Sequence, residues 1–262
     1  SRNGKADYDY SYNFQNWYPS AEFETKNTVT NVGLYELTPF SKFELKGDDV
    51  YEELQKICTA NVKNEIGRCT YTQMLNSDGG IETDLTVICI SENHYRVIGA
   101  AATRERDKFH IKKHINQNIE LTDVTDDYVC LGIFGPKSRE LMKDISGEDF
   151  SNDNFRFGHS KNLKIENSDV WVQRLSYVGE VGYELYINNS EAKLIFNKII
   201  DIGKKFNLSL CGAHAMDTLR MESGFLHWGH DISPEENQLE AGLNFAISFK
   251  KNYDFVGKQA LL

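Results

Sequence analysis

The segment 174–187 constrains the fold of this chain more than any other. It reads Arg-Leu-Ser-Tyr-Val-Gly-Glu-Val-Gly-Tyr-Glu-Leu-Tyr-Ile, which predicts a strand, a tight turn and a second strand. Gly179 and Gly182 bracket the turn, because glycine adopts the positive φ that a hairpin loop or bulge needs. After the turn, Tyr183 and Leu185 would share one face of the strand, since successive side chains alternate.

Glu184 and Tyr186 would share the opposite face of that strand. A carboxylate among aromatic rings suits a flat ligand that carries N–H donors. An ordinary hairpin with a solvent-facing glutamate produces the same pattern, because strands with one polar face are common. The pattern therefore indicates a candidate binding site and leaves the ordinary hairpin open.

Composition narrows the classes of protein and partner. The 262 residues are enough for one large domain or two ordinary ones, and 40% hydrophobic content supports a packed core. The formal net charge of −10 argues against binding to nucleic acid or to an anionic membrane surface. No apolar run reaches the ~18 residues of a membrane span. A small anionic ligand stays possible, because it responds to local charge.

The cysteines and the start of the chain indicate the compartment. Five scattered cysteines form no C-x-x-C pair, so neither disulfides nor a thiolate metal site is expected. Cys89 and Cys130 lie in apolar runs and are interpreted as core residues. The first residues have no apolar stretch, so no signal peptide is expected, and the missing initiator methionine indicates a segment of a longer chain. We expect a cytoplasmic location.

Strands and helices mix along the chain without strict alternation, and hairpins recur. This order favours an α+β fold with mainly antiparallel sheets. Residues 1–20, rich in Tyr and Asn, are expected to form an extended arm. The expected strands are 32–37, 42–45, 69–75, 85–90, 94–98 and 129–134, and the expected helices are 50–62, 104–114, 136–142, 190–202 and 213–223.

Asp84 is the second candidate for chemistry. It lies four residues after Gly80 and just before the apolar run 85–90. A carboxylate at the mouth of a buried strand is desolvated, which shifts its pKa and favours nearby cations. The alternative is an aspartate that forms the turn at a strand edge.

Three other patterns have structural interpretations that we prefer. His227 and His230 are poorly spaced for a metal and lack a third ligand nearby, so no metal site is expected. Asp217 and Arg220, three residues apart on a helix, are expected to form an intrahelical pair. The basic cluster 104–113 is expected to be a solvated helix face, with contact to an anionic ligand tail as the alternative.

Several segments, taken together and in order, resemble the aminomethyltransferase family, which includes the T-protein of glycine cleavage. The resemblance runs from about residue 12 to the C-terminus. The segments are Gly33-Leu-Tyr-Glu-Leu-Thr-Pro-Phe-Ser-Lys-Phe-Glu44, Tyr71-Thr-Gln-Met-Leu-Asn-Ser-Asp-Gly-Gly-Ile-Glu-Thr-Asp84, Gly135-Pro-Lys-Ser-Arg139, Tyr177-Val-Gly-Glu-Val-Gly-Tyr-Glu184, His227-Trp-Gly-His-Asp-Ile232, Leu239-Glu-Ala-Gly-Leu243 and Asp254-Phe-Val-Gly-Lys258.

Within that family, the Thr-Pro-Phe at 38–40 and the His-Trp-Gly-His-Asp at 227–231 are more similar to the folate-binding domains of dimethylglycine and sarcosine dehydrogenases. Met216 stands where glycine-cleavage members carry an arginine that contacts folate, which agrees with this branch. It leaves contacts to the glutamate tail of folate undefined.

The resemblance implies a tetrahydrofolate-binding fold of intertwined lobes spanning 21–262, with the change of lobe near 130–160. The family's C-terminal β-barrel would be absent from this segment. It also implies that the carboxylate of Glu184 grips the pterin edge, that Asp84 is the catalytic carboxylate beside N5 and N10, and that aromatic rings line the site. The implied ring-lining residues are Tyr71, Tyr177, Tyr95 and Phe157.

The implied activity is a one-carbon transfer that forms 5,10-methylenetetrahydrofolate, as the folate part of a dimethylglycine- or sarcosine-type demethylating enzyme. The implied cofactor is tetrahydrofolate, with FAD on an absent or separate domain. The implied partners are a flavin oxidoreductase domain or a lipoyl carrier protein. The alternatives are a glycine cleavage T-protein proper, a folate-dependent demethylase of a sulfonium compound, and a non-catalytic folate-binding module.

Overall fold

The computed structural model describes residues 7–62 and 65–262, which form a mixed α+β structure in two compact units. The chain passes back and forth between these units. Of the described residues, the first comprises 7–37, 129–157 and 162–225, and the second comprises 38–62, 65–128, 158–161 and 226–262.

A six-stranded sheet forms the centre of the first unit, in the order β11-β1-β7-β10-β9-β8. Strand β1 pairs in parallel with β11 and antiparallel with β7, while β10 pairs antiparallel with β9. The strands are β1 (Val32–Glu36), β7 (Tyr128–Phe134), β8 (Ser160–Ile165), β9 (Ser168–Gln173), β10 (Gly182–Asn188) and β11 (Leu208–Cys211).

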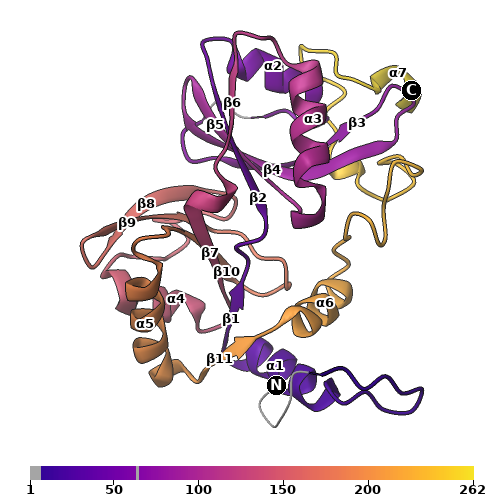
Figure 1. The fold of residues 1–262 in the computed structure, drawn as a ribbon. Helices are drawn as coiled ribbons and strands as arrows, with labels where there is room; N and C mark the ends of the chain where they lie inside the picture. The colour runs from indigo at the N-terminus through magenta and orange to yellow at the C-terminus, as the bar shows by residue number, and fades with distance from the viewer. Residues whose placement is uncertain (1–6, 63–64) are drawn as a thin grey trace. The chain divides into compact units, whose positions relative to one another are not determined.

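Helices α4 and α5 cover one face of this sheet (Figure 1). Leu141 and Ile145 of α4, with Ile195 and Ile199 of α5, pack on the apolar strand residues because each helix repeats them at i, i+4. The described helices of the unit are α1 (Tyr18–Thr30), α4 (Ser138–Ser146), α5 (Ala192–Gly203) and α6 (Ala213–Glu222), with a 3₁₀ turn at Lys204–Phe206.

The second unit contains a five-stranded antiparallel sheet in the order β3-β4-β5-β2-β6. Its strands are β2 (Ser41–Lys46), β3 (Cys69–Leu75), β4 (Ile81–Ser91), β5 (His94–Gly99) and β6 (Glu120–Asp123). Neither sheet closes into a barrel within the described residues.

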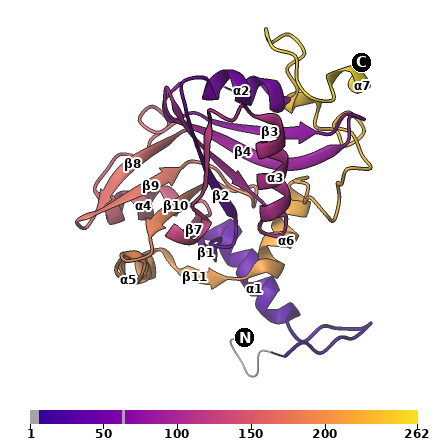
Figure 2. The same cartoon turned by 45° about the horizontal axis from the view of Figure 1, so that its top comes forward.

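One face of the second sheet is apolar and carries α2 (Val50–Ile57) and α3 (Arg104–His114). Figure 2 shows α3 lying across β4. Leu54 and Ile111 pack on Leu85, Val87 and other strand residues that alternate toward this face. The unit also contains α7 (Lys258–Leu261) and 3₁₀ turns at Ala101–Thr103, Thr125–Asp127 and Asn244–Ala246.

Several predicted elements are confirmed with the same bounds, including the strand Cys69–Leu75 and the helix Arg104–His114. Asp217 and Arg220 form the expected intrahelical pair, at 2.7 Å. The helix expected over 50–62 ends at Ile57, and the helix expected at 190 begins at Ala192.

Two expectations of the sequence are wrong. Helix α1 begins at Tyr18 and extends to Thr30, where no helix was expected, because its apolar residues form no continuous stripe. The tight turn expected within 174–187 is an eight-residue loop, since β9 ends at Gln173 and β10 begins at Gly182. Arg174 anchors that loop by donating to the carbonyl oxygen of Phe155 and, at 2.7 Å, to Oδ1 of Asn152.

Among the described residues, no helix is both long enough and apolar enough to cross a membrane. The buried cysteines include Cys89 and Cys130, as expected, at 1% and 0% exposure.

Candidate functional site

Asp84 lies on β4 directly opposite Gln73 of β3 in the antiparallel register. Nε2 of Gln73 donates to Oδ1 of Asp84 at 2.6 Å. Burial raises the pKa of Asp84 to about 6, while hydrogen bonds from Tyr71 and Gln73 oppose that rise by stabilising the anion. Asp84 is therefore a desolvated but oriented carboxylate that titrates just below neutral pH.

A second glutamine, Gln238, fixes the orientation of the Gln73 side chain. Nε2 of Gln238 donates to Oε1 of Gln73, and both side chains are fully buried. Because Oε1 of Gln73 accepts from Gln238, its amide can turn only its N–H toward Asp84. The resulting chain, from Gln238 through Gln73 to Asp84, holds the carboxylate in one orientation. Neither glutamine was predicted from the sequence, since a single glutamine in a strand or loop has no distinctive spacing.

Asp107 of α3 is an acidic residue whose pKa depends on the charge of Asp84. Burial, with smaller contributions from the charges of Asp84 and Glu82, raises the pKa of Asp107 to about 7, while the hydrogen bond from Thr103 and the charge of Arg106 oppose the rise. Thr103 donates to Oδ2 of Asp107 at 2.7 Å, and the nearby cation is Arg106, which pairs with Glu82. The titrations of Asp84 and Asp107 are thus linked, and a pH profile of this unit contains both.

Replacing Gln73 with leucine should raise the pKa of Asp84 further. The lost hydrogen bond stabilises the ionised form only, and its removal should move the Asp84 titration to higher pH by about 1 pH unit, within the range for a hydrogen bond to a charged group. Carbon-13 NMR of aspartate carboxyls measures the shift. An Asp107→Asn control separates the two linked titrations. An unchanged Asp84 titration in Gln73→Leu would contradict the role given to Gln73.

The aromatic candidates of this unit have different positions. Tyr71 is 37% exposed, and its ring stacks on Phe245 at a centroid distance of 6.1 Å and an angle of 20°. Tyr95 is fully buried among the core side chains between the sheet and its helices. A ligand could reach Tyr71 and Phe245 without disturbing the core, whereas contact with Tyr95 would require the core to open.

Glu184 lies on β10 in the first unit, as the alternation predicted. Tyr183, Leu185 and Ile187 face the apolar core, while the hydroxyl of Tyr186 donates to Oε2 of Glu184 at 2.9 Å. Glu184 is 9% exposed, and burial raises its pKa. The expected shared face of Glu184 and Tyr186 is confirmed, and the glutamate is buried, so the reading as a solvent-facing residue is wrong.

Two more candidates, Tyr177 and Phe157, lie on or beside the loop that precedes β10. The ring of Tyr177 stacks on Phe225 at 6.1 Å and 19°. Gly179 has a φ of +75°, and a Cβ there would lie 2.0 Å from Oγ of Ser223, so glycine is required. A cavity of about 280 Å³ lies beside this loop, and Phe157, which is 69% exposed, lines it with Arg174 and Glu180.

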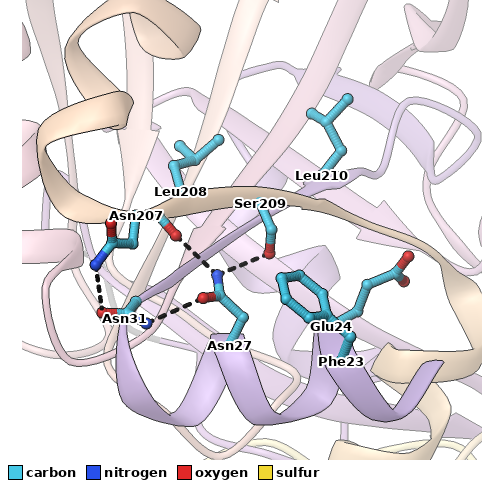
Figure 3. Close-up of a pocket in the computed structure, with 8 residues that line it drawn as sticks. All are labelled: Phe23, Glu24, Asn27, Asn31, Asn207, Leu208, Ser209 and Leu210. Carbon is cyan, nitrogen blue, oxygen red and sulfur yellow. Dashed lines mark hydrogen bonds between the residues drawn. The ribbon is translucent and has the colours of Figure 1, made fainter. Parts of the chain in front are cut away.

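A larger cavity, about 660 Å³, lies between α1 and β11 of the same unit (Figure 3). Nδ2 of Asn27 donates to the carbonyl of Asn207 and to Oγ of Ser209, and Nδ2 of Asn31 donates to Oδ1 of Asn27. Its polar groups therefore bind one another and tie α1 to the edge strand. None of the candidate residues from the sequence lines this cavity.

The remaining sequence patterns form pairs rather than sites. The rings of His227 and His230 stack at 4.1 Å, and no group of three potential metal ligands occurs among residues 7–62 and 65–262. Arg104 of the basic cluster pairs with Asp123 and Asp126 at 2.8 and 2.9 Å. These contacts give Arg104 a structural role on the surface of α3.

Comparison with known protein families shows the family to which the chain belongs. Residues 3–251 match the family described as the GCVT N-terminal domain, and the chain belongs to this family. The fold described above is therefore that of a GCVT N-terminal domain.

Two groups of relatives match nearly the whole chain. The 4-methylaminobutanoate oxidase (formaldehyde-forming) of Paenarthrobacter nicotinovorans is 38% identical over 97% of this chain and 31% of its own length. Mitochondrial dimethylglycine dehydrogenase of Rattus norvegicus is 33% identical, over 96% of this chain and 30% of its own length. The aminomethyltransferase of Halothermothrix orenii is 32% identical, over 94% of this chain and 68% of its own length. The chain thus spans about a third of the first two relatives.

Solved structures agree on the fold. The glycine cleavage system aminomethyltransferase T from Bartonella henselae superposes with a TM-score of 0.83 at 21% identity, covering 97% of this chain and 70% of that one. A chain of the heterotetrameric sarcosine oxidase from Corynebacterium sp. U-96 gives a TM-score of 0.53 at 13% identity, covering 74% of this chain and 95% of that one. The α+β fold with mainly antiparallel sheets is confirmed as that of the aminomethyltransferases.

Proposed function

We propose that the chain transfers a one-carbon unit to tetrahydrofolate and forms 5,10-methylenetetrahydrofolate. The observation that carries the proposal is Asp84, a desolvated carboxylate held by Gln73 and Tyr71 in a member of the GCVT family. A carboxylate of this kind can stabilise a cationic intermediate and accept a proton from it. Tetrahydrofolate would supply the nucleophilic nitrogens N5 and N10, and the protein would bind and orient it and accept the released proton.

Glu184 would bind the pterin ring by its N–H edge. That edge presents a ring N–H beside an exocyclic amino group, and a carboxylate accepts both in a bidentate pair. Tyr186 donates to Oε2 of Glu184 and so fixes the carboxylate plane. The burial that raises the pKa of Glu184 also strengthens its hydrogen bonds to a ligand, because water competes less.

Asp84 would act at the reacting nitrogens. With a pKa of about 6 it is mostly ionised at pH 7, by a ratio of about ten to one. N5 would attack the iminium carbon of the donor, and N10 would form the second bond to that carbon as the donor's amine leaves. Of the two protons lost from N5 and N10, one would go to the leaving amine, and the Asp84 anion, which would also stabilise the cationic carbon, would accept the other. Its fixed orientation avoids the cost of reorganising the charge during the reaction.

Tyr71, Tyr177 and Phe157 would line the ring and the tail attached to it, because each presents aromatic surface outside the cores. Tyr95 is left out of this set because its ring is part of the apolar core between the second sheet and its helices. Residues 21–262 would form one folate-binding domain, and the arm expected over 1–20 would end at Tyr18, where α1 begins.

The longer protein would be a dimethylglycine- or sarcosine-type demethylating enzyme. The support is that a methylaminobutanoate oxidase and a dimethylglycine dehydrogenase match 97% and 96% of this chain at 38% and 33% identity. FAD and the flavin oxidoreductase part would then lie on another domain or chain. Aminomethyltransferases at 32–33% identity keep the glycine cleavage reaction, with its lipoyl carrier, as the second candidate.

Titration calorimetry with tetrahydrofolate, followed by NMR detection of 5,10-methylenetetrahydrofolate, tests the function. The chain should bind tetrahydrofolate and should form the product faster than the uncatalysed reaction, from an iminium released by a flavin oxidase acting on sarcosine. An aminomethylated lipoyl carrier as donor distinguishes the second candidate. Failure of the wild-type chain to bind tetrahydrofolate would overturn the proposal.

A further inference from the structure

Gln173 is the last residue of β9, directly opposite Glu184 of β10 in the antiparallel register. It is fully buried, yet neither Nε2 nor Oε1 has a hydrogen-bond partner within the described parts of the chain. Directly opposed side chains in an antiparallel pair leave the same face of the sheet, with Cβ atoms about 5 Å apart. The amide of Gln173 and the carboxylate of Glu184 are therefore neighbours on one face.

Such an amide requires an explanation, because burying unpaired polar groups costs free energy and native structures keep them few. Glu184 could accept from Nε2 of Gln173, but its Oε2 accepts from Tyr186 instead. This face of the sheet thus holds the carboxylate of Glu184, whose Oε2 already accepts a hydrogen bond, and the amide of Gln173, whose N–H and C=O groups are both available to a ligand. A ligand that supplies the missing partners would remove the cost.

We infer that Gln173 is a specificity-determining residue that contacts the pterin ring beside the edge bound by Glu184. This inference rests on the proposed binding of tetrahydrofolate. A carboxylate only accepts, whereas a carboxamide both donates and accepts. The pair therefore complements a heterocycle in which an N–H and an amino group stand next to a carbonyl oxygen, which is the pattern of a 2-amino-4-oxo pterin. Adjacent strands are about 4.8 Å apart, so two side chains directly opposite each other can contact neighbouring polar atoms on one edge of the ring.

Gln173→Met tests the inference because it keeps length and removes both polar atoms. The dissociation constant for tetrahydrofolate should rise about tenfold, the effect expected from losing one to two uncharged hydrogen bonds. The thermal midpoint of the ligand-free protein should stay equal or rise, since an unpaired buried amide is removed. A fragment without the tail, 6-methyltetrahydropterin, should lose affinity by the same factor, which assigns the loss to the ring.

Gln55→Met is the matched control, because Gln55 is also buried but donates to Oδ1 of Asn61 and to the carbonyl of Val62, at 2.9 and 2.8 Å. It should lower the thermal midpoint and leave tetrahydrofolate binding unchanged. Gln173→Asn, which keeps the amide but shortens its reach, should also weaken binding and serves if the methionine variant does not fold.

Wild-type affinity in both Gln173 variants would overturn the inference. If the wild-type chain binds tetrahydrofolate and Glu184→Gln weakens it, that result leaves the proposed function standing. If the wild-type chain itself does not bind, the proposed function fails first.

Discussion

Asp84→Asn should reduce the rate of one-carbon transfer to tetrahydrofolate by about 10²–10⁴, the range for loss of a general acid–base group. The amide has nearly the same shape but neither carries the charge that stabilises an iminium nor accepts the proton. Because Glu184 and not Asp84 is assigned to ring binding, the dissociation constant of tetrahydrofolate should stay within a few-fold. Single-turnover kinetics and calorimetry measure the two quantities separately.

The matched control is Asp107→Asn, which removes the linked acid on α3 and keeps Asp84. It should move the pH profile and retain most of the rate at its optimum, since Asp107 has no assigned contact with substrate. Transfer at the wild-type rate by Asp84→Asn, with tetrahydrofolate bound, would show that the catalytic assignment is wrong.

Asp84→Asn also has a predicted effect on the stability of the protein. The pKa of Asp84 is about 6 in the folded protein and 3.8 ordinarily, so the folded state binds the proton more strongly. The free energy of unfolding of the wild type should therefore fall as pH rises from about 4 to about 6. Asp84→Asn lacks that fall and should be more stable at pH 7 by up to about 3 kcal/mol. Denaturant unfolding at pH 4 and pH 7 measures the difference; equal slopes with pH would contradict it.

The fold was predictable wherever hydrophobic periodicity is strong. The strand Cys69–Leu75 and the helix Arg104–His114 follow directly from alternation and from the 3.6-residue repeat. Helix α1 lacks a continuous apolar stripe and gains its packing from β11 and α6, which are distant in sequence. The interleaving of the units depends on long-range pairs such as β1 with β7 and β11, which no local pattern reveals.

The candidate site was predictable in part for the same reason. Alternation alone placed Glu184 and Tyr186 on one face, and the hydrogen bond between them follows from that geometry. The roles of Glu184 and Asp84 came from the family resemblance, because no spacing distinguishes a binding carboxylate from a turn residue. Gln73 and Gln173 became visible only from the register, which sets each of them opposite a carboxylate.

Glu184→Gln should weaken tetrahydrofolate binding by about 10- to 100-fold, the value of a hydrogen bond to a charged group. A carboxylate accepts two N–H groups from the pterin edge, whereas the amide turns a donor toward one of them and leaves that donor unpaired. Product formation at saturating tetrahydrofolate should change much less than affinity, because Asp84 is intact. Calorimetry measures the affinity, and single-turnover kinetics measure the rate.

Glu53→Gln is the matched control, since it makes the same substitution at a buried glutamate of α2 that pairs with Lys56 at 2.6 Å and does not line the cavity beside the loop before β10. Its dissociation constant should stay within about twofold of the wild type, within the small effect of substitutions away from a binding contact.

Binding through Glu184 should also depend on pH. Burial raises the pKa of Glu184, and only its ionised form accepts both N–H groups, so wild-type affinity should fall as pH decreases through that raised pKa. The Glu184→Gln variant cannot show that fall at this position. If both proteins lose affinity in parallel as pH decreases, another group binds the pterin edge and Glu184 has a structural role on β10.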